Sequence, residues 1–402
     1  MEELSWGSII ARMFMQLGPV WISLIVLFTL SIVYKRKLGL YGKLFDSTIG
    51  MIGFALVMFW VFVGVFGGPL DMLVTHDPLG QVSGMKNKVP GTPMRSPDEG
   101  EYAYFLLGGD NLARDVFSRL IKGAWVVVQI APIATLFAFM VGITLGLPAG
   151  YYGGKLDTTL SFLANLILAF PVILLFYLLV TPEIVLTGIP NYMAIFLFIF
   201  PLIFMCILLN SRYYTQPRIR TPLLIGVLGL LGWLYLSLVS TNGYAVPGKI
   251  IGLPPVLDLF DIDPGILVVF VSVVFVNSPT VFRIVRGLAM DIKTRDYVAA
   301  AQTRGEGPWY IMLWEILPNA RGPLIVDFCL RIGYTTILLG TLGFFGLGLE
   351  SESPDWGSTI NAGRRLLALY PHAAIAPAVA LLTLVLGLNL LADGLREESL
   401  RD

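Results

Sequence analysis

The chain has 402 residues, of which 56% are hydrophobic and only 13% are charged. That charged share is about half of what a soluble domain carries, so the composition excludes an ordinary water-soluble protein and predicts a membrane protein. The 27 basic and 27 acidic residues cancel. A chain without net charge gives no electrostatic reason to expect nucleic-acid binding.

Long uncharged stretches recur along the whole sequence. About 20 helical residues cross the roughly 30 Å of hydrocarbon in a bilayer, so each stretch predicts one membrane-spanning helix. Continuous apolar runs favour an all-α polytopic bundle over a β-barrel, whose strands alternate apolar and polar residues over about ten positions. We expect nine spans, at about 17–34, 49–69, 124–150, 158–181, 191–210, 222–241, 264–282, 322–347 and 373–392.

Basic residues cluster at several predicted turns and indicate an orientation. Cytoplasmic loops carry an excess of lysine and arginine, so we expect the N-terminus outside and the C-terminus in the cytoplasm. The loop at 70–123 is then exterior, although it carries six basic residues, and its length favours a small folded cap. The expected cytoplasmic clusters are Lys35, Arg36, Lys37 and Lys43, then Arg212, Arg218 and Arg220, then the basic residues of 283–321.

The ends of the chain and its few cysteines and histidines add smaller expectations. Met1-Glu2-Glu3 has no basic residue, so we expect the first apolar run to stay as an anchor rather than act as a signal peptide. Cys206 and Cys329 lie in apolar stretches and are expected as small core residues, not as a disulfide or metal pair. We interpret His76 and His372, near span ends, as interfacial histidines.

Residues 296–319 form a short charged, amphipathic stretch between two long apolar ones. The pattern predicts one or two short helices, with breaks at Gly305 and at Gly307-Pro308. Small side chains at Ala299, Ala300 and Ala301 would let another backbone come close, and Gly305 would allow the turn that aims the second helix. An ordinary interfacial helix would explain the amphipathic pattern but not this ordered spacing.

Further motifs lie on both sides of this stretch. They are Leu107-Gly108-Gly109-Asp110 through Leu120, Gly150-Tyr151-Tyr152-Gly153-Gly154 with Asp157, Gly343-Phe344-Phe345-Gly346-Leu347-Gly348-Leu349, Pro354-Asp355-Trp356-Gly357, and Asn389 through Arg396.

Taken in this order, the motifs resemble permease subunits of ATP-binding-cassette importers of the dipeptide/oligopeptide/nickel group, C-type. In that family the stretch at 296–319 is a coupling loop, the Glu-Ala-Ala motif, which grips a separate ATPase. Here Ala299 replaces the glutamate, and Gly109 and Ala113 replace the usual threonine and glycine. The resemblance assigns ATPase coupling to Asp296, Tyr297, Ala299, Ala300, Ala301, Arg304, Gly305, Trp309, Leu317 and Pro318.

The resemblance also implies a domain organisation. A six-helix, MetI-like core would carry one extra N-terminal helix within 1–48. The first core helix and the long exterior loop would occupy 49–123, and the rest of the core 124–402, with two inserted helices at about 190–260.

By that resemblance the chain is a non-catalytic subunit of the bacterial cytoplasmic (inner) membrane. It would pair with a homologous second permease and two cytoplasmic ATPase subunits, and a soluble substrate-binding protein would dock outside. We expect no cofactor on this chain, because ATP and Mg²⁺ would bind the ATPases. The nearest phosphate-loop mimic, residues 149–156, lacks the leading glycine and the trailing serine or threonine of a P-loop.

Polar residues inside predicted spans are the remaining candidates, because a charge there costs roughly 2.5 to 3.5 kcal/mol. Asp327 and Arg331 share one helical face at i, i+4, as a structural ion pair or as part of a substrate pathway. Asn277 and Asn389 are expected to form interhelical hydrogen bonds.

Two other classes of function compete with the importer. A secondary transporter driven by an ion gradient would need paired repeats and coupling carboxylates at the membrane midplane, where only Asp327 qualifies. An intramembrane enzyme would need clustered His, Asp, Glu or Cys within spans, which the sequence lacks. By the resemblance we expect peptides or related small solutes as the cargo, with opines, sugars and nickel as the alternatives.

Overall fold

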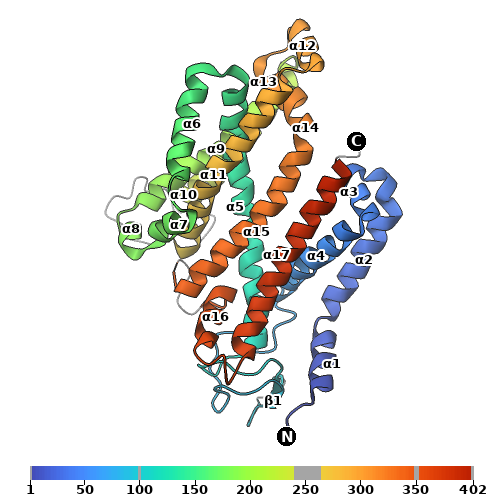
Figure 1. Cartoon of the computed structure of the whole chain (residues 1–402), viewed down its shortest axis with the longest axis vertical. Helices are drawn as coiled ribbons and strands as arrows, with labels where there is room; N and C mark the ends of the chain where they lie inside the picture. The colour runs from blue at the N-terminus through green and yellow to red at the C-terminus, as the bar shows by residue number, and fades with distance from the viewer. Residues whose placement is uncertain (1, 98–100, 240–263, 348–352, 400–402) are drawn as a thin grey trace. The chain divides into compact units, whose positions relative to one another are not determined.

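The structure is a computed structural model that describes residues 2–97, 101–239, 264–347 and 353–399. Helices dominate the described residues, and the strands among them form one short hairpin (Figure 1). The chain divides into two compact units. We call Met1–Pro132 with Cys329–Asp402 the N/C unit, and Ile133–Phe328 the middle unit.

The N/C unit begins with the helices α1 (Trp6–Gln16), α2 (Gly18–Tyr34), α3 (Gly39–Lys43) and α4 (Thr48–Gly67), with short 3-10 turns η1 (Lys35–Lys37) and η2 (Leu44–Asp46). The strands β1 (Thr92–Pro93) and β2 (Tyr104–Phe105) pair antiparallel. The unit also holds the first part of α5 (Val116–Tyr152), the last part of α15 (Arg321–Phe345), α16 (Trp356–Arg364) and α17 (His372–Ser399).

Glycines let α4 and α17 come unusually close. A Cβ added at Gly53 would lie 2.3 Å from the backbone nitrogen of Leu391, and one added at Gly394 would lie 2.4 Å from Cα of Gly50. Small residues at helix interfaces allow such backbone contact in membrane proteins. This packing gives the Asn389–Arg396 motif a structural role through its glycine.

The loop between α4 and α5 is folded, as expected for residues 70–123. Asp115 accepts hydrogen bonds from the Ser118 hydroxyl (2.6 Å) and from the Thr75 hydroxyl (2.8 Å), and its carboxylate lies 3.1 Å from Nδ1 of His76. His76 is only 7% exposed and is held inside this loop, and its position at the membrane interface stays a prediction. This network lies where α5 begins, which places that start at Val116 rather than at residue 124.

Two sequence motifs meet in the N/C unit. The guanidinium of Arg119, which is 1% exposed, donates to the carbonyl of Ser353 over 2.9 Å. The indole of Trp356 donates to the carbonyl of Leu120 over 2.9 Å. The motifs at 107–120 and 354–357 therefore form one packed contact. Residues Gly348 and Leu349 of the motif at 343–349 lie outside the described residues.

The middle unit contains the rest of α5, then α6 (Gly154–Leu168), α7 (Val172–Val180), α8 (Pro182–Leu186), α9 (Ile189–Arg212), α10 (Pro217–Val239) and α11 (Pro264–Ile292). After α11 come α12 (Asp296–Thr303), α13 (Pro308–Tyr310), the π-helical turn η4 (Ile311–Ile316), α14 (Leu317–Asn319) and the start of α15. Within this unit, α12 and α8 lie at opposite ends (Figure 1).

Eight helices among the described residues are long and apolar enough to span a membrane, and a bent pair raises the number to nine. That pair corrects the prediction of one continuous span at 158–181. α6 and α7 meet at an angle of 80°, and the break at 169–171 includes Pro171. Proline has no N–H to donate, and it disfavours helical backbone at the preceding residue.

The predicted insertion at 190–260 is helical where the structure describes it. α9 and α10 form an adjacent pair, and the hydroxyl of Tyr235 donates to the carbonyl of Ile195 over 2.9 Å. Residues 240–263, which end the predicted insertion, lie outside the described residues.

Candidate functional site

The predicted turn at Gly305 is present at the end of α12. Glu306 N donates to Ala301 O over 3.2 Å and Gly305 N donates to Gln302 O over 3.0 Å. These are the two hydrogen bonds of a Schellman helix end, which needs a left-handed residue. Gly305 has φ +80°, and an added Cβ would meet no atom within 4 Å. The glycine therefore serves the backbone conformation rather than a tight packing space.

One side of α12 packs against the core of the middle unit. Val298 and Ala301 are both fully buried. They belong to an apolar cluster that includes Ala289 of α11 and Ile311 and Met312 of η4. Our expectation that Ala301 contacts a partner protein is therefore wrong, because its side chain packs inside this chain.

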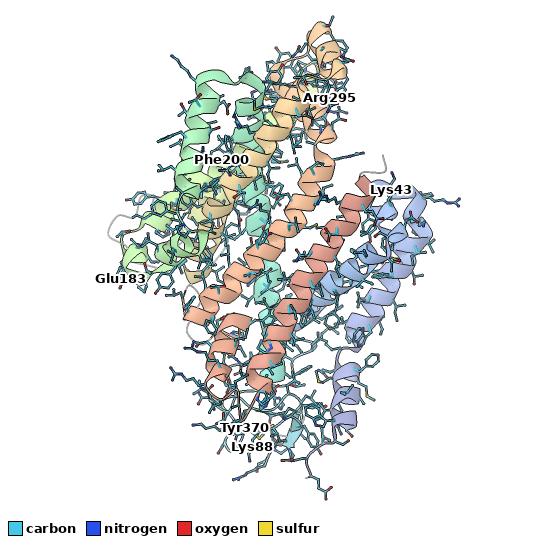
Figure 2. The ribbon with its side chains drawn as sticks, in the orientation of Figure 1. Lys43, Lys88, Glu183, Phe200, Arg295 and Tyr370 are labelled. Carbon is cyan, nitrogen blue, oxygen red and sulfur yellow. The ribbon has the colours of Figure 1, made fainter. Side chains whose placement is uncertain are left out.

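The opposite side of α12 is exposed and carries small side chains. We call Asp296, Ala299, Ala300 and Thr303 the outer face of α12; all four are exposed. Tyr297, which is 39% exposed, and Arg304 flank it. Arg295, at the start of the helix, carries the exposed side chain labelled in Figure 2. The predicted coupling residues thus divide between a buried and an accessible side.

The other predicted coupling residues also divide in this way. Trp309 and Leu317 are partly buried and pack against the same apolar cluster as Ala301, whereas Pro318 is exposed. Arg304 donates to Oε1 of Glu315 over 2.8 Å, which ties the end of α12 to η4. The segment 296–319 therefore consists of short helices that are tied together into one folded unit.

The turn at Gly150–Gly154 supports this segment. Lys293 Nζ, just after α11, donates to the carbonyls of Gly150 (2.7 Å) and Tyr151 (3.2 Å). The side-chain amide of Gln302 in α12 lies 3.2 Å from the hydroxyl of Tyr151. Two motifs that are far apart in the sequence are thus joined at one end of the middle unit.

An ion pair joins α6 and α11 near this turn. Both guanidinium arms of Arg286 reach Asp157, one of them over 2.6 Å between Nη2 and Oδ2. A two-armed Arg–carboxylate contact fixes geometry as well as charge. Asp157 follows the Gly150–Gly154 turn in the sequence motif, and this contact gives it a structural role.

The remaining candidates lie in helices. Asp327 and Arg331 sit four residues apart on α15, both are partly buried, and each interacts with other groups, so their mutual pairing stays a prediction. Asn277 is 4% exposed on α11 and also interacts with neighbours. Asn389 is exposed on α17. Its hydrogen bonding between helices therefore stays a prediction.

Sequence reasoning missed one set of contacts at this site. Trp314 in η4 contacts Ser211 and Arg212 at the end of α9. Ser211 and Trp314 are 103 positions apart in the sequence, and no local sequence pattern signals such a contact.

Comparison with known proteins places the chain among transport proteins. It is 28% identical over 300 residues to a glutathione transport system permease protein of Pectobacterium atrosepticum, covering 75% of this chain and 73% of that protein. It is 23% identical over 357 residues to a dipeptide transport system permease protein of Alkalihalophilus pseudofirmus, covering 89% and 87%. A dipeptide permease protein of Haemophilus influenzae is 26% identical over 299 residues, covering 74% and 75%.

The family described as binding-protein-dependent transport system inner membrane component matches residues 142–397, which is more than half of the chain. The matched region contains the segment 296–319 and the helices that hold it. Dependence on a binding protein favours the importer over a carrier driven by an ion gradient. The chain therefore belongs to the inner membrane components of binding-protein-dependent transport systems, as a non-catalytic permease subunit of an ATP-binding-cassette importer.

Proposed function

We propose that the outer face of α12 is the surface on which a separate cytoplasmic ATPase docks. The proposal rests on the difference between the buried and the exposed side of α12. Its buried side is fixed by Val298 and Ala301, and its exposed side offers Ala299 and Ala300, whose small side chains let a partner helix or groove approach closely. A docking element must combine a rigid base with an accessible face, and α12 does so.

The core contacts of α12 provide a route for movement. The same apolar cluster contains Val285, Ala289 and Ile292 of α11 together with Val298 and Ala301 of α12. Because protein interiors are close-packed, α12 cannot shift alone without opening voids. A displacement of α12 by the ATPase would therefore carry α11 and, through Lys293, the end of α5.

We propose peptides or related small solutes, including glutathione, as the cargo, because the relatives above carry those names. The chain would form the pathway with a homologous second permease, two ATPase subunits would supply ATP and Mg²⁺, and a soluble binding protein would deliver cargo. In this assignment α2 and the α9–α10 pair are additions to a six-helix core. ATP would drive import by binding the two conformations of the complex with different affinity.

A size series at one exposed position tests the docking surface. Ala300→Arg places a long charged side chain on the outer face, whereas Ala300→Ser keeps a small one. We expect the arginine variant to insert normally but to lose the ATPase during purification and to stop transport. The serine variant should retain both. Normal transport and full ATPase retention by Ala300→Arg would refute the docking assignment.

A further inference from the structure

The end of α9 contacts the segment 296–319 directly. The indole Nε1 of Trp314 lies 3.1 Å from the hydroxyl oxygen of Ser211 and donates to it. The guanidinium carbon of Arg212 lies 4.6 Å from the centre of the Trp314 ring, within cation–π range. Ser211 is 8% exposed and donates in turn to the carbonyl of Leu208 over 2.9 Å.

Apolar packing continues this contact along α9. Phe204, Ile207 and Leu208 pack against the cluster that holds Met312 and Leu313 of η4. One side of the last turns of α9 is therefore shared with the core beneath α12. The α9–α10 pair is consequently no loose appendage of the middle unit.

The location of Trp314 gives this contact significance. It lies in η4, a six-residue π-helical turn. π-Helical geometry is rare and usually marks a functional position within a helix, since it is less favourable than the α-helix. Neighbouring contacts must hold such a turn in place. The described contacts of the Trp314 indole nitrogen and ring face come from Ser211 and Arg212.

We propose that α9 braces the ATPase-docking segment, with Trp314 as the positioning residue and Ser211 and Arg212 as its supports. This inference rests on the proposed docking function of α12. It assigns a role to the inserted helices: they fix the orientation of η4 and, through Arg304 and Glu315, the end of α12. Loss of the brace would loosen the docking face without removing it.

The test compares variants that remove side-chain hydrogen bonds of α9, and Ser211→Ala removes two of them, the bond from Trp314 and the bond to Leu208. Ser211→Ala and Trp314→Phe remove the contact with η4. Tyr235→Phe is the matched control, because it removes the bond to Ile195 inside the α9–α10 pair. Ser211→Thr keeps the hydroxyl and should rescue. Amide hydrogen exchange of residues 296–306 is measured in the purified permease pair, and retention of the ATPase is measured separately after a salt wash.

We expect Ser211→Ala and Trp314→Phe to speed exchange at 296–306 by roughly two- to tenfold, the shift expected for one lost hydrogen bond. Their double variant should show less than the product of the two effects, because both act on one contact. Exchange rates equal to those of Tyr235→Phe would overturn the brace. Faster exchange with undiminished ATPase retention would instead overturn the docking role of the segment, so the two failures are distinguishable.

The middle unit also has an apolar groove of about 480 Å³ between α5, α6, α9 and α11. Its lining includes Leu163, Tyr192, Phe196 and Phe275, and Phe200 is labelled in Figure 2. Arg283 follows Phe282, a lining residue, on α11. Its side chain is exposed and donates to the amide oxygen of Asn165 over 2.9 Å. Among the described residues, no carboxylate is paired with this arginine.

We infer that this groove holds an acyl chain of an anionic phospholipid whose phosphate binds Arg283. Arg283 is the first charged residue of α11 and directly follows a lining residue of the groove, and guanidinium groups favour phosphate. The groove supplies apolar walls for the chain. Every phospholipid carries the phosphate, but only an anionic headgroup has a net negative charge, which favours it over a zwitterionic one beside this arginine.

Native mass spectrometry in nanodiscs tests this site. With phosphatidylglycerol discs we expect a retained lipid in the unmodified protein and at least a severalfold loss in Arg283→Gln and in Met193→Trp, which fills the groove. Lys155→Gln removes another exposed cation outside the groove and should keep the lipid. Equal retention from phosphatidylcholine discs, or loss in Lys155→Gln equal to that in Arg283→Gln, would overturn the inference.

Discussion

At Gly305 the backbone conformation, not crowding, decides which side chain is allowed. Its φ is +80° and an added Cβ would meet open space, whereas Gly307 has φ −68° and equally open space. The two glycines therefore form a matched pair that differs in handedness. L-residues pay about 1–2 kcal/mol for the left-handed conformation.

We accordingly predict that Gly305→Ala destabilises the end of α12 by about 1 kcal/mol and that Gly307→Ala is neutral within about 0.5 kcal/mol. Amide exchange at residues 301–306 measures the difference. Equal exchange in the two variants would show that the turn does not need its glycine. This comparison tests the local structure alone and does not depend on the ATPase.

His76 makes the α4–α5 loop sensitive to pH. Burial opposes the charged form of this histidine, but the hydrogen bond to Asp115 and the charge of that carboxylate, with smaller contributions from Tyr102 and Glu101, outweigh burial and raise the pKa of His76 above 6.5. A raised pKa means that protonated His76 stabilises the folded loop. That contribution is complete below about pH 6.5 and is lost as the pH rises through the folded-state pKa.

The unfolding temperature of the purified protein should therefore fall more steeply between about pH 6 and pH 8 than that of His76→Gln. The difference between the two pH profiles isolates the histidine from other titrating groups. Parallel profiles would mean that the Asp115 contact does not persist in solution.

The close backbone contact between α4 and α17 leads to a prediction about helix packing. Gly53→Ala forces a Cβ to within 2.3 Å of the Leu391 nitrogen and must push α4 from α17, which should cost about 1–3 kcal/mol. A Cβ added at Gly226, inside α10, would meet no atom within 4 Å. Gly226→Ala should be neutral or stabilising, because alanine favours helix over glycine by about 1 kcal/mol. Thermal unfolding in detergent separates the two, and an equal loss in both would contradict the packing.

The helices also show what the sequence could and could not predict. The length of the uncharged stretches predicts most of the spans, and the glycine at position 305 predicts the turn at the end of α12. The break between α6 and α7 was missed because Pro171 looks like Pro201 and Pro279, which lie inside α9 and α11. Whether a proline breaks a membrane helix depends on neighbours that can satisfy the freed carbonyl, and this is tertiary information.

The same limit applies to the site. Ala300 and Ala301 are chemically identical neighbours, yet one is exposed and the other is buried against η4. The contact between Ser211 and Trp314 joins α9 to the segment 296–319. A family motif marks the segment that matters, but packing decides which of its residues remain available to a partner.

For the whole molecule, the orientation in the membrane is the remaining prediction. We expect the two termini on opposite sides of the membrane, because the described residues hold nine candidate spans when α6–α7 is taken as one. From the basic turns at 35–43, 212–220 and 283–321 we expect the C-terminus and the segment 296–319 in the cytoplasm. In a background with Cys206→Ala and Cys329→Ala, Glu3→Cys should react with an impermeant maleimide in intact cells. Thr215→Cys, in the exposed turn between α9 and α10, should react only after permeabilisation. This turn directly follows α9, whose end contacts Trp314. Labelling of position 215 in intact cells would therefore place the end of α9 and the segment 296–319 outside the cell. A cytoplasmic ATPase could not reach the segment there.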